Sequence, residues 1–110
     1  MKTILFLLAS VLVASAVDVE RLADAIKRQE NSLKYPYGIK SIPIKGNTRA
    51  EREAYARKIC VNTIRNNHRR WRSAGSRGNY IDFLADRYCP AADDPQGNAN
   101  WKRNVKQFYK

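Results

Sequence analysis

The sequence of 110 residues is 44% hydrophobic and carries a formal net charge of +11 at pH 7. Its length accommodates one domain with a modest core, and its charge attracts nucleic acid, anionic lipid and anionic wall polymers. Two cysteines and one histidine without ligand spacing exclude a zinc site, and nothing else in the sequence requires a metal or another cofactor.

The first 16 residues have the three parts of a secretory signal. Lys2 supplies a positive start, an apolar run extends from Ile4 to Val13, and Ala14-Ser15-Ala16 forms a cleavage site of small residues. The run is too short to span a bilayer and no stop-transfer segment follows it, although an uncleaved membrane anchor remains the alternative. We therefore expect export to the periplasm or the extracellular space, with residues 17–110 as a single domain without stable membrane insertion.

Helical periodicity begins directly after this segment. An apolar face predicts a first helix from Val17 to Leu33, with Asp18 as its N-cap. Proline and glycine interrupt residues 35–46, which we expect to form an extended loop with one or two short strands. A capping box that starts at Thr48 predicts a second helix, which runs to about Arg72.

Two shorter helices are expected in the last third of the chain. Asn79 begins the third helix and Pro90 ends it. Residues 93–97 are typical of a turn, and apolar residues at helical spacing predict a final helix from about Asn100. The pattern as a whole predicts an all-α or α-dominated (α+β) fold of about four helices, with a small irregular or β section after the first one.

Basic residues dominate the second predicted helix and the segment after it. No acidic residue occurs from Ala54 to Ile81. An exported protein meets wall polymers and lipid more often than nucleic acid, so nucleic acid is not the expected partner. A solvated basic face that only aids solubility is the alternative. The candidate polyanion-binding residues in this stretch are Arg65, Arg69, Arg70, Arg72 and Arg77.

The two cysteines, Cys60 and Cys89, both follow the predicted signal. In an oxidising compartment such a pair is expected to form a disulfide. A crosslink closing a loop of this length would stabilise the fold by about 3–4 kcal/mol in the chain-entropy treatment.

Glu30 is the residue that conflicts with its helix. At about 100° per residue it falls in the middle of the apolar stripe formed by Val19, Ala23, Ile26 and Leu33, in the last turn. Desolvation and the C-terminal end of the helix dipole both raise the pKa of such a carboxyl, toward a proton-donating acid. The alternative is that the helix ends sooner and Glu30 faces water or pairs with an arginine.

Glu30 is followed by Asn31 and Ser32, and then by the segment Tyr37-Gly38-Ile39-Lys40-Ser41-Ile42. This pattern resembles the lysozyme-like group, above all lytic transglycosylases and goose-type lysozymes. In that group a catalytic Glu ends a helix and precedes a Ser and a Gly-containing hydrophobic segment. Arg87-Tyr88-Cys89-Pro90 stands where those enzymes have a Tyr-Asn-x-Gly segment, and residues 100–109 are similar to their closing helix.

The resemblance implies an enzyme that cuts the β-1,4 bond between N-acetylmuramic acid and N-acetylglucosamine in peptidoglycan. It makes Glu30 the catalytic acid and base, and Tyr37, Ser41 and Tyr88 substrate-binding residues. Core packing for the tyrosines and turn capping for Ser41 are the alternatives. Two-carboxylate hydrolysis would need a second acidic group, and no good candidate appears. The chain therefore favours the single-Glu mechanism of lytic transglycosylases, in which the substrate's 6-hydroxyl attacks and a 1,6-anhydro product forms.

Two other functions remain open. A non-enzymatic exported module could bind an anionic polymer, cell wall or nucleic acid, through its arginines, with Trp71 adding stacking. A degenerate lysozyme-like domain could instead bind glycan without cleaving it. The first predicts salt-dependent binding that is indifferent to Glu30, and the second predicts glycan binding without turnover. The expected partners are peptidoglycan strands and, after them, other anionic wall polymers.

Overall fold

The computed structural model describes residues 17–110, so the predicted signal at 1–16 lies outside the described part of the chain. Four α-helices make up most of this part: α2 (Val19–Glu30), α3 (Arg49–Ser73), α4 (Tyr80–Tyr88) and α5 (Pro95–Tyr109). A 3-10 turn, η1 (Pro36–Gly38), lies between α2 and α3, and residues 17–110 contain no strand. The α-dominated fold of four helices is confirmed, and the section after the first helix is irregular rather than β.

Local sequence signals set the start of three helices. Asp18 caps α2 by accepting a hydrogen bond from the backbone N–H of Arg21 at 3.1 Å. Thr48 caps α3 by accepting one from the backbone N–H of Glu51 at 3.1 Å. Asn79 caps α4 through its side-chain oxygen. Each cap satisfies a backbone donor that the helix itself leaves without a partner, as the sequence predicts.

The start of α5 differs from the prediction. The helix begins at Pro95 rather than near Asn100, so the turn predicted at residues 93–97 is wrong for residues 95–97, whereas Asp93 does lie in a turn. Asp94 caps it by accepting a hydrogen bond from the backbone N–H of Gly97 at 2.9 Å. Asp followed by Pro starts turns and helices equally well, because proline has the φ of the first helical residue and lacks only a donor that would be unsatisfied there.

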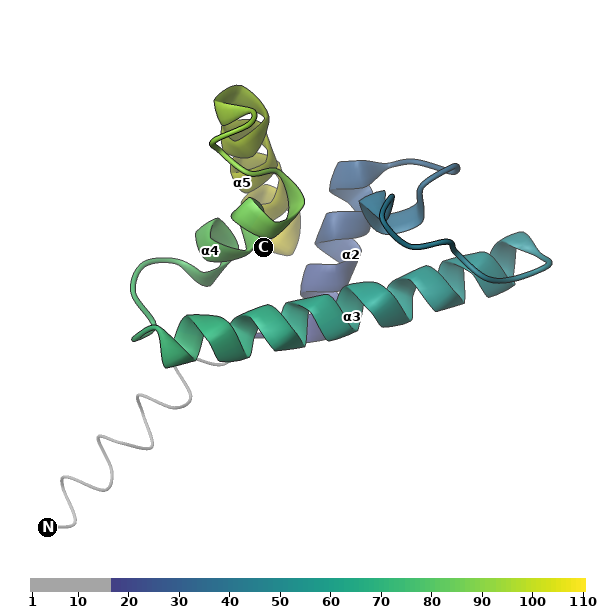
Figure 1. The fold of residues 1–110 in the computed structure, drawn as a ribbon, viewed down its shortest axis with the longest axis horizontal. Helices are drawn as coiled ribbons and strands as arrows, with labels where there is room; N and C mark the ends of the chain where they lie inside the picture. Colours follow the sequence, from purple (N-terminus) through teal and green to yellow (C-terminus); the bar gives the residue numbers. More distant parts are fainter. Residues whose placement is uncertain (1–16) are drawn as a thin grey trace, which may run out of the picture.

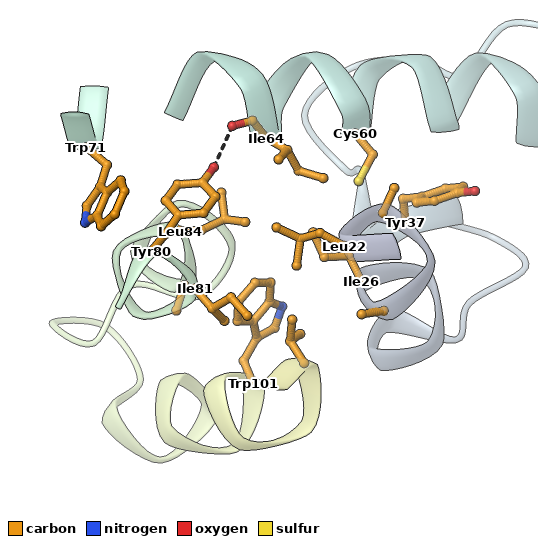
Figure 2. Close-up of a cluster of buried hydrophobic side chains, with 14 of the residues drawn as sticks. Leu22, Ile26, Tyr37, Cys60, Ile64, Trp71, Tyr80, Ile81, Leu84 and Trp101 are labelled. Carbon is orange, nitrogen blue, oxygen red and sulfur yellow. Dashed lines mark hydrogen bonds between the residues drawn. The ribbon is translucent and has the colours of Figure 1, made fainter. Parts of the chain in front are cut away.

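The helices surround one apolar core. The long helix α3 runs along one side of the molecule, with α2, α4 and α5 on the other (Figure 1). Figure 2 shows side chains from all four helices meeting between them, with the indole of Trp101 reaching inward from α5. Leu22, Ile26, Ile64 and Leu84 are fully buried there, and burying each side chain of this kind contributes about 1.5–3 kcal/mol.

The first helix is shorter than predicted, and this changes the surroundings of its last turn. It ends at Glu30, and Leu33, expected on the buried stripe, is 71% exposed. The stripe that is buried consists of Leu22, Ala23, Ala25 and Ile26. Among residues 17–110, no helix combines the length and the apolar character needed to cross a membrane.

Candidate active site

Glu30 is the last residue of α2. Asn31 follows in the left-handed conformation, with φ of 41°, and its backbone N–H donates to the carbonyl of Lys27 at 2.9 Å, which ends the helix. The Glu30 side chain is partly buried. The helix therefore ends where the alternative interpretation placed its end, yet the carboxyl does not turn to water.

The partner of the Glu30 carboxyl is an indole. Trp101 on α5 donates its Nε1–H to Glu30 Oε1 at 3.1 Å. The indole is 3% exposed and stacks on the ring of Tyr88, with 5.2 Å between ring centroids and 18° between planes. Tyr88 thus packs against the face of the Trp101 indole, while the N–H at the edge of the same indole binds Glu30. No ion pair to Glu30 occurs within residues 17–110, so the arginine partner that the alternative interpretation allowed is absent there.

The turn η1 closes over the same carboxyl. A Cβ on Gly38 would lie 2.5 Å from Glu30 Cδ and 2.8 Å from Oε2, so only glycine allows this approach. Gly38 also has φ of 71°, which favours glycine independently. Tyr37 beside it has φ of 59° and is buried, and its hydroxyl accepts a hydrogen bond from Arg57 at 3.1 Å. The turn is therefore fixed by a strained residue that α3 holds in place.

This environment makes Glu30 a weaker acid than an exposed glutamate. Burial raises the pKa of Glu30, while the hydrogen bond from Trp101 and the charge of Lys40 offset part of the rise. Burial also raises the pKa of the neighbouring Tyr88, which stays a neutral phenol. A carboxyl with a raised pKa keeps its proton closer to neutral pH, as a general acid requires.

A small groove lies beside this cluster. It has a volume of about 220 Å³ and is lined by Gly38, Ile39, Lys40, Ser41, Thr63, Arg87 and Tyr88. Gly38 and Tyr88 connect it to Glu30, the first by direct contact and the second through Trp101. A larger groove of about 490 Å³ lies between α2, the segment after it and the start of α3. We regard the smaller one as the candidate substrate groove because Gly38, which contacts the Glu30 carboxyl, is part of its lining.

The structure separates the three residues predicted to bind substrate. Ser41 and Tyr88 both line the small groove. Tyr37 is 3% exposed, lines the larger groove and is held by Arg57, so its position matches the alternative role of core packing. Ser32, which follows Glu30 in the resemblance, accepts a hydrogen bond from the backbone N–H of Tyr35 at 3.0 Å and thereby shapes the turn.

Three of the four acidic residues on and between α4 and α5 have side-chain partners, whereas the carboxylate of Asp93 has none within residues 17–110. Asp82 pairs with Lys106 at 2.7 Å. Asp86 accepts a hydrogen bond from the side chain of Asn98 at 3.2 Å, and Asp94 caps α5. None of them accompanies Glu30 in the manner of a second catalytic carboxylate. Within residues 17–110, no three His, Cys, Asp or Glu side chains lie together as a metal site would require.

The predicted disulfide between Cys60 and Cys89 is not formed. Both residues are free thiols, with Cys60 buried and Cys89 partly exposed. The Sγ of Cys60 contacts the hydroxyl of Tyr88 at 3.5 Å. The Sγ of Cys89 lies against α5, where it would be 3.0 Å from a Cβ on Gly97. The prediction was wrong because the sequence gives the number and positions of the cysteines but not the directions of their side chains.

The predicted polyanion-binding arginines are exposed. Arg65, Arg69, Arg70, Arg72 and Arg77 all face solvent at the C-terminal half of α3 and after it. Trp71 among them is buried, packs on His68 and Tyr80 with centroid distances of 5.5 Å each, and donates its Nε1–H to the carbonyl of Arg77. It therefore does not offer its ring to a nucleobase, and the basic surface consists of arginines alone.

Trp101 and Arg57 are the site residues that sequence reasoning did not identify. Trp101 was expected only as part of an apolar helix face, and Arg57 only as one charge in a basic run. Arg57 donates to Asp24 at 2.8 Å and Glu20 at 2.6 Å, which joins α3 to α2 beside Tyr37. A buried tryptophan needs a partner for its N–H, and this was the one available signal.

Comparisons with protein-family models, with curated proteins and with solved structures find no match for this chain.

Proposed function

We propose that this protein cleaves the glycan strands of peptidoglycan, as a compact lysozyme-like enzyme of the lytic transglycosylase kind. The observation that carries the proposal is the environment of Glu30. Its carboxyl is partly buried, has a raised pKa, is held by an indole N–H instead of a cation, and contacts a glycine that lines a groove. A structural carboxylate would be expected to pair with one of the many basic side chains.

The geometry supports a division of labour between the two carboxyl oxygens. Oε1 accepts the hydrogen bond from Trp101, so in the neutral acid the proton is on Oε2, which faces Gly38. This proton passes to the glycosidic oxygen as the bond to C1 of the muramoyl residue breaks. The 6-hydroxyl of the same residue then attacks C1 and gives its proton to the Glu30 carboxylate. The acid is regenerated, and the products are a 1,6-anhydro end and a free 4-hydroxyl.

The single-carboxylate mechanism fits the partners of the other acidic residues. Asp82, Asp86 and Asp94 are each engaged in an ion pair, a hydrogen bond or a helix cap. Two-carboxylate glycosidases need a second carboxyl about 5–10 Å from the acid, as nucleophile or to activate water. Attack by the substrate's own hydroxyl needs no such group.

Mass analysis of peptidoglycan digested with residues 17–110 tests the proposal. We expect anhydro-muropeptides, whereas reducing ends would indicate a hydrolase. Glu30→Gln should lower the cleavage rate by at least ~100-fold, the usual contribution of a positioned acid. The matched control is Glu53→Gln, which removes a partly exposed carboxylate paired with Lys27 and should leave the rate unchanged. Full activity of Glu30→Gln would refute the proposal.

A second candidate function is attachment to an anionic polymer through α3. Its support is the set of five exposed arginines named above, none of which forms an ion pair within residues 17–110. Replacing Arg69, Arg70 and Arg72 with Gln should weaken pelleting with purified wall at low salt, and high salt should remove the difference. Replacing Lys34, Lys45 and Lys58 instead removes the same charge elsewhere and is the control.

A further inference from the structure

The groove beside Glu30 contains two cations and no anion. Lys40 comes from the segment after η1 and Arg87 from the last turn of α4. Both side chains are exposed, and neither forms an ion pair with any residue in the 17–110 segment. The charge of Lys40 reaches the Glu30 carboxyl, whose pKa it lowers. Lys40 and Arg87 therefore place uncompensated positive charge close to the proposed point of cleavage.

The other groove next to α2 differs in this respect. Its lining carries charges of both signs: Lys27 pairs with Glu53 at 3.3 Å, and Asp24 lines the same groove. Arg28 and Arg49, also in the lining, form no ion pair within residues 17–110. Arg57, on the neighbouring face of α3, pairs with Glu20 and Asp24. Of these two grooves, the one lined by Lys40 and Arg87 has no carboxylate in its lining. It would therefore attract an anionic part of a ligand more strongly than the larger groove.

We propose that Lys40 and Arg87 bind a carboxylate on the sugar next to the cleaved bond. The inference rests on the proposed function and names the form of the substrate. In peptidoglycan this carboxylate is the lactyl group of the muramoyl residue, which is free only where the stem peptide has been removed. Where the peptide remains, the same carbon is a neutral amide. The preferred substrate is therefore the peptide-free strand, and the reaction that supplies it is hydrolysis of the lactyl–peptide amide bond.

The size and charge of the groove agree with this assignment. A volume of about 220 Å³ is below the range of roughly 300–1,000 Å³ that holds a whole small ligand, so the groove suits one substituent of a sugar. A guanidinium and an ammonium are both good partners for a carboxylate. A carboxylate bound there would also offset the charge of Lys40 at Glu30, so the acid would keep its proton to higher pH with this substrate than with a neutral one.

The test compares three substrates. These are peptide-free glycan strands, the same strands with the lactyl carboxylates converted to amides, and strands that retain their peptides. The wild type should cleave the peptide-free strands with a kcat/KM at least ~10-fold above that for the amidated strands. Lys40→Gln and Arg87→Gln should each reduce this preference, chiefly through KM. Lys58→Gln, an exposed lysine on α3, should retain the wild-type preference.

The outcomes separate this inference from the proposed function. Equal cleavage of all three substrates would overturn the carboxylate subsite and leave the glycan-cleaving function intact. Faster cleavage of peptide-bearing strands would mean that the cations bind a carboxylate of the stem peptide, which overturns the lactyl assignment. Cleavage of none would refute the proposed function. Calorimetric binding of the first two substrates to Glu30→Gln then tests the subsite separately, and equal affinities would overturn it.

Discussion

Gly38→Ala tests the contact that closes the site, and Gly78→Ala provides a matched control. The two glycines have φ of 71° and 73°, so an alanine Cβ strains the backbone equally at both, by about 1–2 kcal/mol. At Gly78 a Cβ would meet nothing within 4 Å. At Gly38 it would lie 2.5 Å from Glu30 Cδ. Any difference between the two variants in the free energy of unfolding therefore reports the contact with Glu30.

The size of this difference follows from what Glu30 must do to relieve the clash. Its carboxyl has to move away, and the hydrogen bond from Trp101 is lost. Leaving a buried N–H without a partner costs about 1–3 kcal/mol, so Gly38→Ala should destabilise the protein by ~2–5 kcal/mol in total. A change of about 1 kcal/mol moves the Tm of a domain of this size by roughly 4–8 °C. Gly38→Ala should therefore melt at least ~4 °C below Gly78→Ala.

Urea and thermal unfolding followed by circular dichroism measure both variants. A double-mutant cycle isolates the pair, since Glu30→Ala removes the side-chain atoms that the new Cβ would meet. In the Glu30→Ala background, Gly38→Ala should lower the free energy of unfolding by no more than Gly78→Ala lowers it in the wild type. Glycan cleavage should be lost in Gly38→Ala and retained in Gly78→Ala. Equal destabilisation by Gly38→Ala and Gly78→Ala in the wild-type background would show that Gly38 does not press on Glu30.

Three further predictions concern the buried carboxyl, the thiols and Arg57. Because the pKa of Glu30 is raised in the folded state, the stability that its protonated form contributes is lost as pH rises from the unfolded-state pKa through the folded-state pKa. Glu30→Gln should therefore gain Tm relative to the wild type as the pH rises above the ordinary glutamate value of 4.5, and a loss in thermal melts would contradict this. Iodoacetamide without reductant should label both cysteines, and Cys89 should react before Cys60. Burial shields the Cys60 thiol and raises its pKa to about 11. A mass spectrum of the unreduced protein with no label would contradict this. Arg57→Gln should lower the free energy of unfolding in urea by ~1–2 kcal/mol, because Arg57 binds Asp24, Glu20 and Tyr37. Lys27→Gln, which removes only the pair with Glu53, should lower it by less than ~1 kcal/mol. Equal losses would show that the contacts of Arg57 add nothing to stability.

The parts of the fold that sequence could predict are those fixed by nearby residues. The caps at Asp18, Thr48 and Asn79 each depend on a backbone donor two or three residues away. The errors arose where one local pattern allows two structures. Asp94 and the proline after it fit a turn as well as a helix start. Leu33 matched the helical period but lies beyond the left-handed residue that ends α2, and periodicity does not detect such an end.

In the candidate site, too, sequence identifies the residue with a local signal and misses the partners that come from distant parts of the chain. Glu30 could be found from sequence because its conflict with the apolar stripe of α2 is local. Its partner could not, since Trp101 lies 71 residues away and its place on an apolar helix face indicated only core packing. Gly38 could be named from the resemblance, but the reason for glycine there is a distance of 2.5 Å that only the packed structure contains.

The physical problem that this site solves is the protection of an acid in a strongly basic protein. With 21 Lys and Arg residues, a buried carboxyl would readily acquire a cation as partner. A direct ion pair would lower its pKa and hold it ionised at neutral pH. The indole of Trp101 fixes one carboxyl oxygen without contributing charge, and Gly38 lets the turn approach the other closely without a side chain. The nearest charge that acts on Glu30, Lys40, lowers the pKa less than burial raises it. Orientation and a retained proton are thereby obtained together, which an arginine at the position of Trp101 would not allow.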